Sequence, residues 1–377
     1  MNLDKLRKSI KNDMLQVDKS YQFFLTGNPM LDAFIGSGGL PKYQLEYIWA
    51  TNSVGKSTLA IQILASFQKQ MENQDYIILY YDTEESVTYQ RLQNLGVIAS
   101  DNLFLVNPES IEKAGDHIFN ASIESNNADI FVIWDTIAQT PSEEENNAEI
   151  KIGMSARALT KLFKRLKFSK LKLTMFALNQ FRDNVTGNKF APQEPVVCNA
   201  VKHKSFLNLA AAKKKSELIE KEIGFITTFK TNKSKIISPH RSMEFEATYI
   251  DGYDSPLTLI NFYRRRKLVG KKGGGWFYFI DDKDKSYRLK DFYEYLLTND
   301  CVNRWKFAIE SIYSELYKHD DPKFIKEAKE RIYNYYFEND EIQLDRFTSI
   351  SKSIMSSTED NNYDIEDEED IEDIENE

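Results

Sequence analysis

The stretch Ala50–Thr58, ATNSVGKST, decides how the chain folds, because it matches a phosphate-binding loop at all but one position of the consensus. The P-loop consensus is G-x-x-x-x-G-K-[ST]; its backbone N–H groups wrap the phosphates and the next helix adds its positive end. Ala50 stands at the first glycine position, whereas Gly55, Lys56 and Ser57 are present. Alanine is costly there only if the backbone needs a positive φ. We therefore expect a working nucleotide site.

The P-loop mechanism gives the residues of this stretch separate roles. Lys56 is expected to reach the β and γ phosphates, and the Ser57 hydroxyl is expected to bind magnesium. The alternative is an ordinary strand–loop–helix turn, because short G-K-[ST] matches are common by chance. The residues expected to contact the nucleotide are Thr51, Asn52, Ser53, Val54, Gly55, Lys56, Ser57 and Thr58.

Short apolar runs alternate with longer helical patterns on both sides of the loop. This alternation predicts an α/β fold with a doubly wound, mostly parallel sheet. Strands are expected at 44–49, 76–81, 103–106, 130–134 and 173–178, and helices at 57–71, 86–95, 111–125 and 156–166.

Acidic residues follow two of the expected strands. Asp135 ends FVIWD, the usual position of the carboxylate that helps to hold magnesium, and Asp82 and Glu84 follow ILYY. Glu84 is positioned to deprotonate the attacking water, with Glu85 as its rival. A single acidic residue at a strand end is usually a helix cap. Two such residues at the sheet edge that carries a P-loop favour a catalytic or metal-binding role.

The charge is distributed unevenly along the chain. The net charge is −9, but twelve of the 58 acidic residues lie between Glu359 and Glu377, where no Lys or Arg occurs. The remaining body has a charge of about +3, which is compatible with nucleic-acid binding. The tail has the composition of a disordered segment. It serves either for solubility or as a competitor for basic DNA-binding surface.

Cysteine content and hydropathy indicate the cellular setting. Two cysteines far apart and no apolar run near 20 residues favour a cytoplasmic protein, in the host cell if the chain is viral. Leu3, Leu6 and Ile10 begin an apolar stripe that predicts an amphipathic N-terminal helix, which packs on its own domain or docks on a neighbouring subunit. After residue 255 short aromatic stretches precede helices expected at 304–319 and 322–338.

The ordered motifs resemble the RecA recombinase family over roughly residues 28–300. SGGLPKYQLEYIWATNSVGKST resembles the start of its core, YYDTEESVTYQRLQNLGV its catalytic-glutamate segment, FVIWDT its Walker B strand and TMFALNQF its glutamine-ended strand. The N-terminal helix and KTNKSKIISP make the T-even-phage (UvsX-like) type the most similar. The resemblance implies a RecA-like P-loop ATPase core, an N-terminal polymerisation helix and a small α+β C-terminal domain.

The resemblance also assigns roles near the nucleotide. It implies ATP and Mg²⁺ as cofactors, Glu84 as the catalytic glutamate and Gln180 as the phosphate-sensing residue. Lys233 and Lys235 fall where the family reaches the ATP of a neighbouring subunit. Arg91 falls where the family often stacks a tyrosine on adenine; a guanidinium can also stack.

Two segments are expected to bind DNA. The first follows Walker B, with Ile152 as a wedge near the bases and Arg157 as a phosphate contact. The second is the long aperiodic stretch from Phe181 to about Val201, a length that is usually functional or disordered. Charge and aromatic faces there suit single-stranded DNA; the residues are Phe181, Arg182, Lys189, Phe190 and Asn199.

The function implied is that of an ATP-dependent recombination protein. It would form a filament on single-stranded DNA, pair it with a homologous duplex and exchange strands, with single-strand-binding and loading proteins as partners. A RecA-fold helicase or motor and a non-catalytic, ATP-gated DNA-binding paralogue remain alternatives. The expected parts are a docking segment (1–27), an ATPase core (28–255), a small C-terminal domain (256–357) and an acidic tail (358–377).

Overall fold

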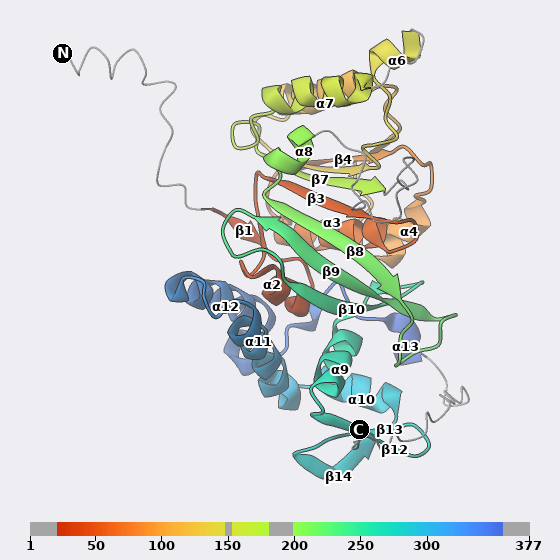
Figure 1. The fold of residues 1–377 in the computed structure, drawn as a ribbon, viewed down its shortest axis with the longest axis vertical. Helices are drawn as coiled ribbons and strands as arrows, with labels where there is room; N and C mark the ends of the chain where they lie inside the picture. Colours follow the sequence, from red (N-terminus) through yellow and green to blue (C-terminus); the bar gives the residue numbers. More distant parts are fainter. Residues whose placement is uncertain (1–20, 148–152, 181–198, 357–377) are drawn as a thin grey trace, which may run out of the picture.

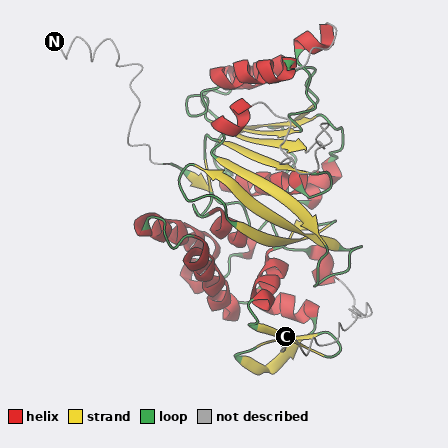
Figure 2. Ribbon diagram, in the orientation of Figure 1, coloured by secondary structure: helices red, strands yellow, loops and turns green. Residues whose placement is uncertain are grey.

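The chain forms a nine-stranded sheet with helices on both faces and a C-terminal region at one end (Figure 1, Figure 2). The computed structural model describes residues 21–147, 153–180 and 199–356. The expected N-terminal helix and the acidic tail lie outside these residues. Among the described helices, none combines the length and apolar character that a bilayer crossing requires.

Six neighbouring strands of the sheet run parallel, which confirms the predicted mostly parallel α/β architecture. In sheet order they are β8 (Leu207–Lys214), β3 (Leu45–Ala50), β7 (Leu173–Gln180), β6 (Asp129–Asp135), β4 (Tyr76–Asp82) and β5 (Leu103–Val106). Three antiparallel strands, which the sequence did not reveal, continue the sheet beyond β8. They are β9 (Gly224–Ser234), β10 (Ser242–Thr248) and β11 (Gly252–Tyr253).

The four central parallel strands, β3, β7, β6 and β4, are largely buried on both faces, as their near-continuous apolar sequences require. Successive residues of β4 alternate between two hydrophobic clusters, Tyr80 in one and Tyr81 in the other. Helices α3 (Lys56–Gln70) and α4 (Tyr89–Asn94) contribute to the first cluster, and α5 (Ile111–Glu124), α7 (Met154–Arg165) and α8 (Asn199–Lys204) to the second. The short α6 (Glu143–Asn147) precedes α7.

Helix α4 is shorter than the predicted 86–95. Asp82 Oδ2 accepts the Val87 N–H at 2.8 Å, which holds the intervening residues in a turn. The Thr88 hydroxyl then caps the helix by accepting the Arg91 N–H at 3.1 Å. The strand-end acid therefore delays the helix by several residues.

The C-terminal region packs on the N-terminal part of the core and continues the first hydrophobic cluster. Tyr336 donates to buried Asp32 at 2.6 Å, and Tyr293 donates to buried Asp254 at 2.6 Å. Burial raises the pKa of both carboxyls to about 7. The elements are β1 (Phe23–Phe24), α2 (Pro29–Ile35), β2 (Leu40–Pro41), α9 (Ser255–Arg265), β12 (Val269–Lys272), β13 (Trp276–Phe279), β14 (Asp282–Tyr287), α10 (Leu289–Leu296), α11 (Val302–Leu316), α12 (Pro322–Tyr336) and α13 (Lys352–Ser356).

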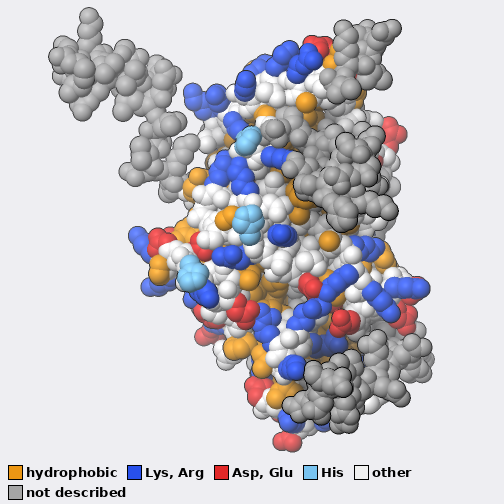
Figure 3. All heavy atoms as spheres, in the orientation of Figure 1, with side chains coloured by type: hydrophobic (Ala, Val, Ile, Leu, Met, Phe, Trp, Pro, Cys, Tyr) orange, Lys and Arg blue, Asp and Glu red, His pale blue; other side chains and the backbone are white. Residues whose placement is uncertain are grey.

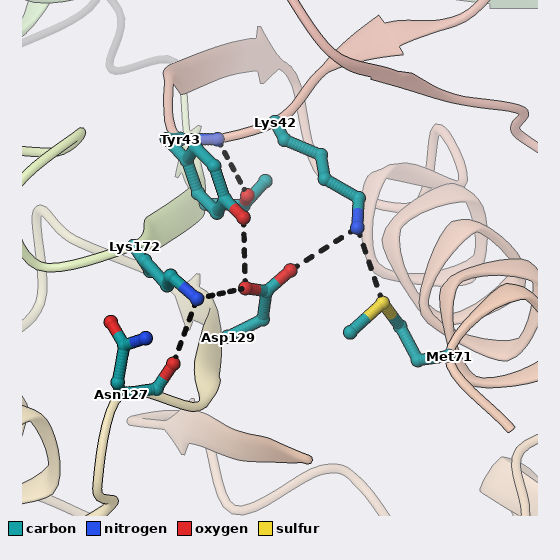
Figure 4. A network of polar contacts seen from close by, with 7 residues as sticks. Lys42, Tyr43, Met71, Asn127, Asp129 and Lys172 are labelled. Atoms are coloured by element: carbon teal, nitrogen blue, oxygen red, sulfur yellow. Dashed lines mark hydrogen bonds and ion pairs between the residues drawn. The ribbon is translucent and has the colours of Figure 1, made fainter. Parts of the chain in front are cut away.

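A polar network joins the amino ends of two central strands, β3 and β6 (Figure 4). Asp129, at the start of β6, accepts from Tyr43 at 2.9 Å and from Lys42 at 3.2 Å. Lys172 lies 3.9 Å from the same carboxylate and donates to the Asn127 carbonyl at 2.9 Å. Because Asp129 is only 6% exposed, its charge ties the segment before β3 to β6 with little screening by water.

We expect Asp129→Asn to lower the free energy of unfolding by about 1–3 kcal/mol, because it leaves Lys42 without its carboxylate. Urea denaturation of the purified protein measures this change. The matched control is Asp75→Asn, an exposed carboxylate near the start of β4, which should change stability by no more than about 0.5 kcal/mol. Equal effects of the two substitutions would contradict a structural role for the network.

Candidate functional site

The residues predicted to bind and hydrolyse the nucleotide follow strands that end at the carboxyl edge of the parallel sheet. Asp82 pairs in register with Asp135 across β4 and β6, and Ala50 pairs with Gln180 across β3 and β7. Parallel strands that end together place their following residues around one crevice, where ligands bind in open α/β sheets. The P-loop therefore lies beside both strand-end acids and Gln180.

The P-loop backbone explains why alanine is accepted at its first position. Ala50 is the last residue of β3, and its φ is not positive. Two residues of the loop are left-handed, Ser53 with φ 58° and Gly55 with φ 91°, and at Gly55 a Cβ would lie 2.7 Å from the Tyr253 hydroxyl. The positional demand for glycine thus falls on Gly55, and Ala50 removes nothing that the loop needs.

Residues from the antiparallel half of the sheet hold the loop, and sequence reasoning missed them. The Val54 carbonyl accepts from Thr227 Oγ1 at 2.9 Å and from the Tyr253 hydroxyl at 3.2 Å. Both donors are fully or almost fully buried. They lie more than 170 residues after the loop, so no local pattern could have indicated them.

Lys56, Ser57 and Asp135 form a compact polar group beneath the loop. The Lys56 ammonium donates to the Thr51 carbonyl at 2.9 Å, and burial lowers its pKa. Burial raises the pKa of Asp135 to about 6, opposed by a hydrogen bond from Ser57 and the charge of Lys56. Tyr80 donates to Asp135 at 3.3 Å. A hydroxyl and a carboxylate in contact are oxygen ligands that suit Mg²⁺ next to phosphates.

The three acids at the carboxyl end of β4 have different surroundings. Asp82 accepts the backbone N–H groups of Glu84 and Val87, so it organises the turn. Glu85 accepts from Asn107 at 2.8 Å, towards β5. Glu84 is exposed and accepts from the amides of Gln139 and Gln180. This geometry favours Glu84 over Glu85 as the general base.

Gln180 links the end of β7 to Glu84. Its side-chain amide donates to Glu84, and its backbone N–H is accepted by Asn179 Oδ1 at 2.9 Å. Gln139, four residues after Asp135, donates to Glu84 at 3.2 Å. Sequence reasoning missed Gln139, although its position shortly after the Walker B strand was a usable signal.

Arg91 lies against the start of α3, near the P-loop. Its guanidinium donates to Thr58 Oγ1 at 3.2 Å and to the carbonyls of Tyr249 and Ile250 at 2.8 and 2.7 Å. Tyr249 and Ile250 are both exposed next to it. The bonds hold the guanidinium plane in place, an arrangement compatible with stacking on a base.

Lys233 and Lys235 lie away from the P-loop, near the amino end of β8. Lys233 pairs with Asn208 in β8 and is level with Tyr47, whereas the P-loop follows Ala50 at the other end of β3. Lys233 and Lys235 donate to carbonyls at the end of α8. The structure therefore does not bring them to the phosphate loop of their own subunit.

The expected DNA-binding residues are only partly described. Arg157 is exposed on α7, a helix along which Lys and Arg side chains gather (Figure 3). Asn199 begins α8, on the downstream side of the second loop. Ile152, Phe181, Arg182, Lys189 and Phe190 lie outside the described residues.

We expect Gly55→Ala to abolish detectable nucleotide binding, because its Cβ would collide with the Tyr253 hydroxyl in a left-handed backbone. Fluorescent ATP-analogue titration measures binding. Gly153→Ala is the matched control: Gly153 also has φ 91°, but no atom lies within 4 Å of the added Cβ. Similar losses in both variants would show that a strained alanine lowers binding by destabilising the subunit as a whole, and would contradict a specific role for the Tyr253 contact.

Comparisons with known proteins agree with the motifs and the fold. The model of the RecA N-terminal domain matches residues 7–254. Protein RecA of Mycoplasma mobile is 28% identical over 315 residues, covering 77% of this chain and 92% of that protein. Protein RecA of Malacoplasma penetrans is 29% identical over 269 residues, covering 70% and 79%. The plasmid-borne Protein RecA of Lactococcus lactis is 28% identical over 280 residues, covering 73% and 79%. The chain therefore belongs to the RecA family of ATP-dependent homologous-recombination proteins.

Proposed function

We propose that this DNA-dependent ATPase turns over ATP at the edge where Lys56, Asp135, Glu84 and Gln180 converge. The contact network that joins the P-loop, the Walker B strand and the glutamine-ended strand carries this proposal. Backbone N–H groups of residues 51–55 wrap the phosphates, and Lys56 neutralises their charge. A bound Mg²⁺, held by Ser57 and Asp135, supplies Lewis-acid stabilisation of the phosphoryl oxygens.

Glu84 is the general base in this proposal. Its carboxylate is exposed at the crevice and is oriented by two amide donors, Gln139 and Gln180. An oriented carboxylate accepts the proton of the attacking water as the phosphoryl group is transferred. Since Gln180 also leads directly into the second DNA loop, it couples the γ-phosphate to DNA binding. Arg91 and its neighbours hold the adenine base of the bound ATP.

The placement of Lys233 and Lys235 supports a head-to-tail filament. They are remote from their own P-loop, as residues that complete the ATP site of the next subunit would be. At the other end of the sheet, the edge strand β5 exposes Phe104, and α5 exposes Ile123. This surface is suited to receive the N-terminal docking segment, residues 1–27, of a neighbour. ATP binding and assembly then form one coupled equilibrium.

The DNA lies along the two loops that follow β6 and β7. Ile152 wedges near the bases, Arg157 contacts phosphate, and residues 181–199 hold the strand. Base pairing with the duplex supplies sequence specificity during strand exchange. Single-strand-binding and loading proteins assist assembly in the cytoplasm, the host's if the chain is viral. The N-terminal helix and the Lys-x-Lys segment favour the T-even-phage type, with the four parts divided at residues 27, 255 and 357.

We expect single-stranded DNA to stimulate ATP hydrolysis strongly, and Glu84→Gln to lower the stimulated rate by about 100-fold or more while DNA binding persists. Steady-state phosphate release and DNA-binding anisotropy measure the two properties. Glu85→Gln is the control and should retain most of the activity, because Glu85 binds Asn107 and not the glutamines.

The same experiment separates the alternatives. Absence of turnover with and without DNA would favour a non-catalytic, ATP-gated paralogue. Hydrolysis accompanied by translocation on duplex DNA, without strand exchange, would favour a helicase or motor. Equal losses in the two glutamine variants would contradict the choice of Glu84 as base.

A further inference from the structure

Helix α8 depends on side chains from elsewhere to satisfy its last carbonyls. It has six residues, and helices this short are marginal unless tertiary contacts support them. Val201 is fully buried and anchors one side. The Val201 carbonyl accepts the Ser205 N–H at 2.9 Å. The carbonyls of Lys202, His203 and Lys204 then have no later helical N–H to accept.

Two lysines from outside the helix bind these three carbonyls. Lys233 Nζ donates to the Lys202 carbonyl at 2.9 Å and to the His203 carbonyl at 2.6 Å. Lys235 Nζ donates to the Lys204 carbonyl at 3.0 Å. Ammonium groups at a helix C-terminus satisfy its orphan acceptors and stabilise the negative end of its dipole. The Ser205 hydroxyl adds one bond, to the Lys202 carbonyl at 2.9 Å.

The lysines are held in an electrostatically crowded place. Burial and the charge of Lys235 lower the pKa of Lys233. Burial and the charges of Lys167 and Lys235 lower the pKa of Lys204. Burial also lowers the pKa of Lys235, opposed by the charge of buried Glu46. An anionic group placed here would relieve this repulsion. In addition, charged phosphate oxygens are stronger hydrogen-bond acceptors than neutral carbonyl oxygens for these ammonium groups.

We propose that Lys233 and Lys235 are exchangeable caps that hold α8 in the unassembled subunit and leave it for the phosphates of the neighbour's ATP. Completion of the inter-subunit site then releases the end of the helix whose first residue is Asn199, a proposed DNA contact. This inference rests on the proposed filament function. It gives nucleotide binding a second route to the DNA-binding segment, separate from Gln180 and acting nearer the amino ends of the strands.

The first test is made without nucleotide and so does not depend on filament formation. In the Lys233→Met/Lys235→Met double variant, amide hydrogen exchange at residues 203–205 should be about threefold to thirtyfold faster than in wild type. Lys230→Met, an exposed lysine on the same strand, is the control and should match wild type. Unchanged exchange in the double variant would overturn the capping role.

The second test compares single-stranded DNA affinity with and without a non-hydrolysable ATP analogue. Wild type and Lys230→Met should bind more tightly when the analogue is present. The double variant should bind DNA with raised affinity in the absence of nucleotide and respond little to the analogue. A double variant that stays at the low, nucleotide-free affinity under both conditions would overturn the inference, since it would have lost only its phosphate contacts.

The outcomes separate this inference from the proposed function. If wild type shows neither analogue-dependent DNA binding nor sedimentation as a polymer, the proposed function fails. Faster exchange in the double variant would still support capping in that case. If wild type behaves as a filament-forming ATPase but exchange in the double variant is unchanged, the capping inference alone fails.

Discussion

The Val54 carbonyl is the point at which the two halves of the sheet meet the nucleotide loop. Thr227 and Tyr253 donate to it from β9 and β11, while the loop itself belongs to the parallel half. The same Tyr253 hydroxyl fills the space that a side chain at Gly55 would occupy. The shape of the phosphate loop is therefore set by antiparallel strands that contribute no residue to the predicted chemistry at the P-loop of their own subunit.

This dependence explains what the sequence could and could not predict. Strand-end chemistry is local: β4 and β6 are continuous apolar runs, so Asp82, Glu84 and Asp135 could be placed at one edge from pattern alone. The choice between Glu84 and Glu85 was open in the sequence, because it depends on Gln139, Gln180 and Asn107, which lie at or beyond the ends of other strands. The side chains of adjacent acids in a turn point in different directions, and the sequence alone does not show which of them faces the site.

The last parallel strand, β8, and the antiparallel strands beyond it were missed for a related reason. β8 contains Ala210–Ala212 followed by lysines, and β9 mixes threonine with lysine, so neither has the strong apolar signature of a buried parallel strand. Their pairing with each other and with β3 stabilises them. Conversely, Ala50 looked like a defect in the motif but occupies an ordinary strand position. The first glycine of the consensus is common at this position but is not required here. The backbone conformation that requires glycine occurs five residues later, at Gly55.

The location of Lys233 and Lys235 has a consequence for the ends of an assembly. In the proposed filament, each subunit would carry the P-loop of one inter-subunit site and the lysines of another. In a linear array, one terminal subunit therefore presents a P-loop with no lysines opposite it, and the other presents lysines with no nucleotide. The two ends are chemically different, so growth and loss of subunits would have a direction. Catalytic capacity per subunit would also rise with filament length, because short filaments hold proportionally more incomplete sites.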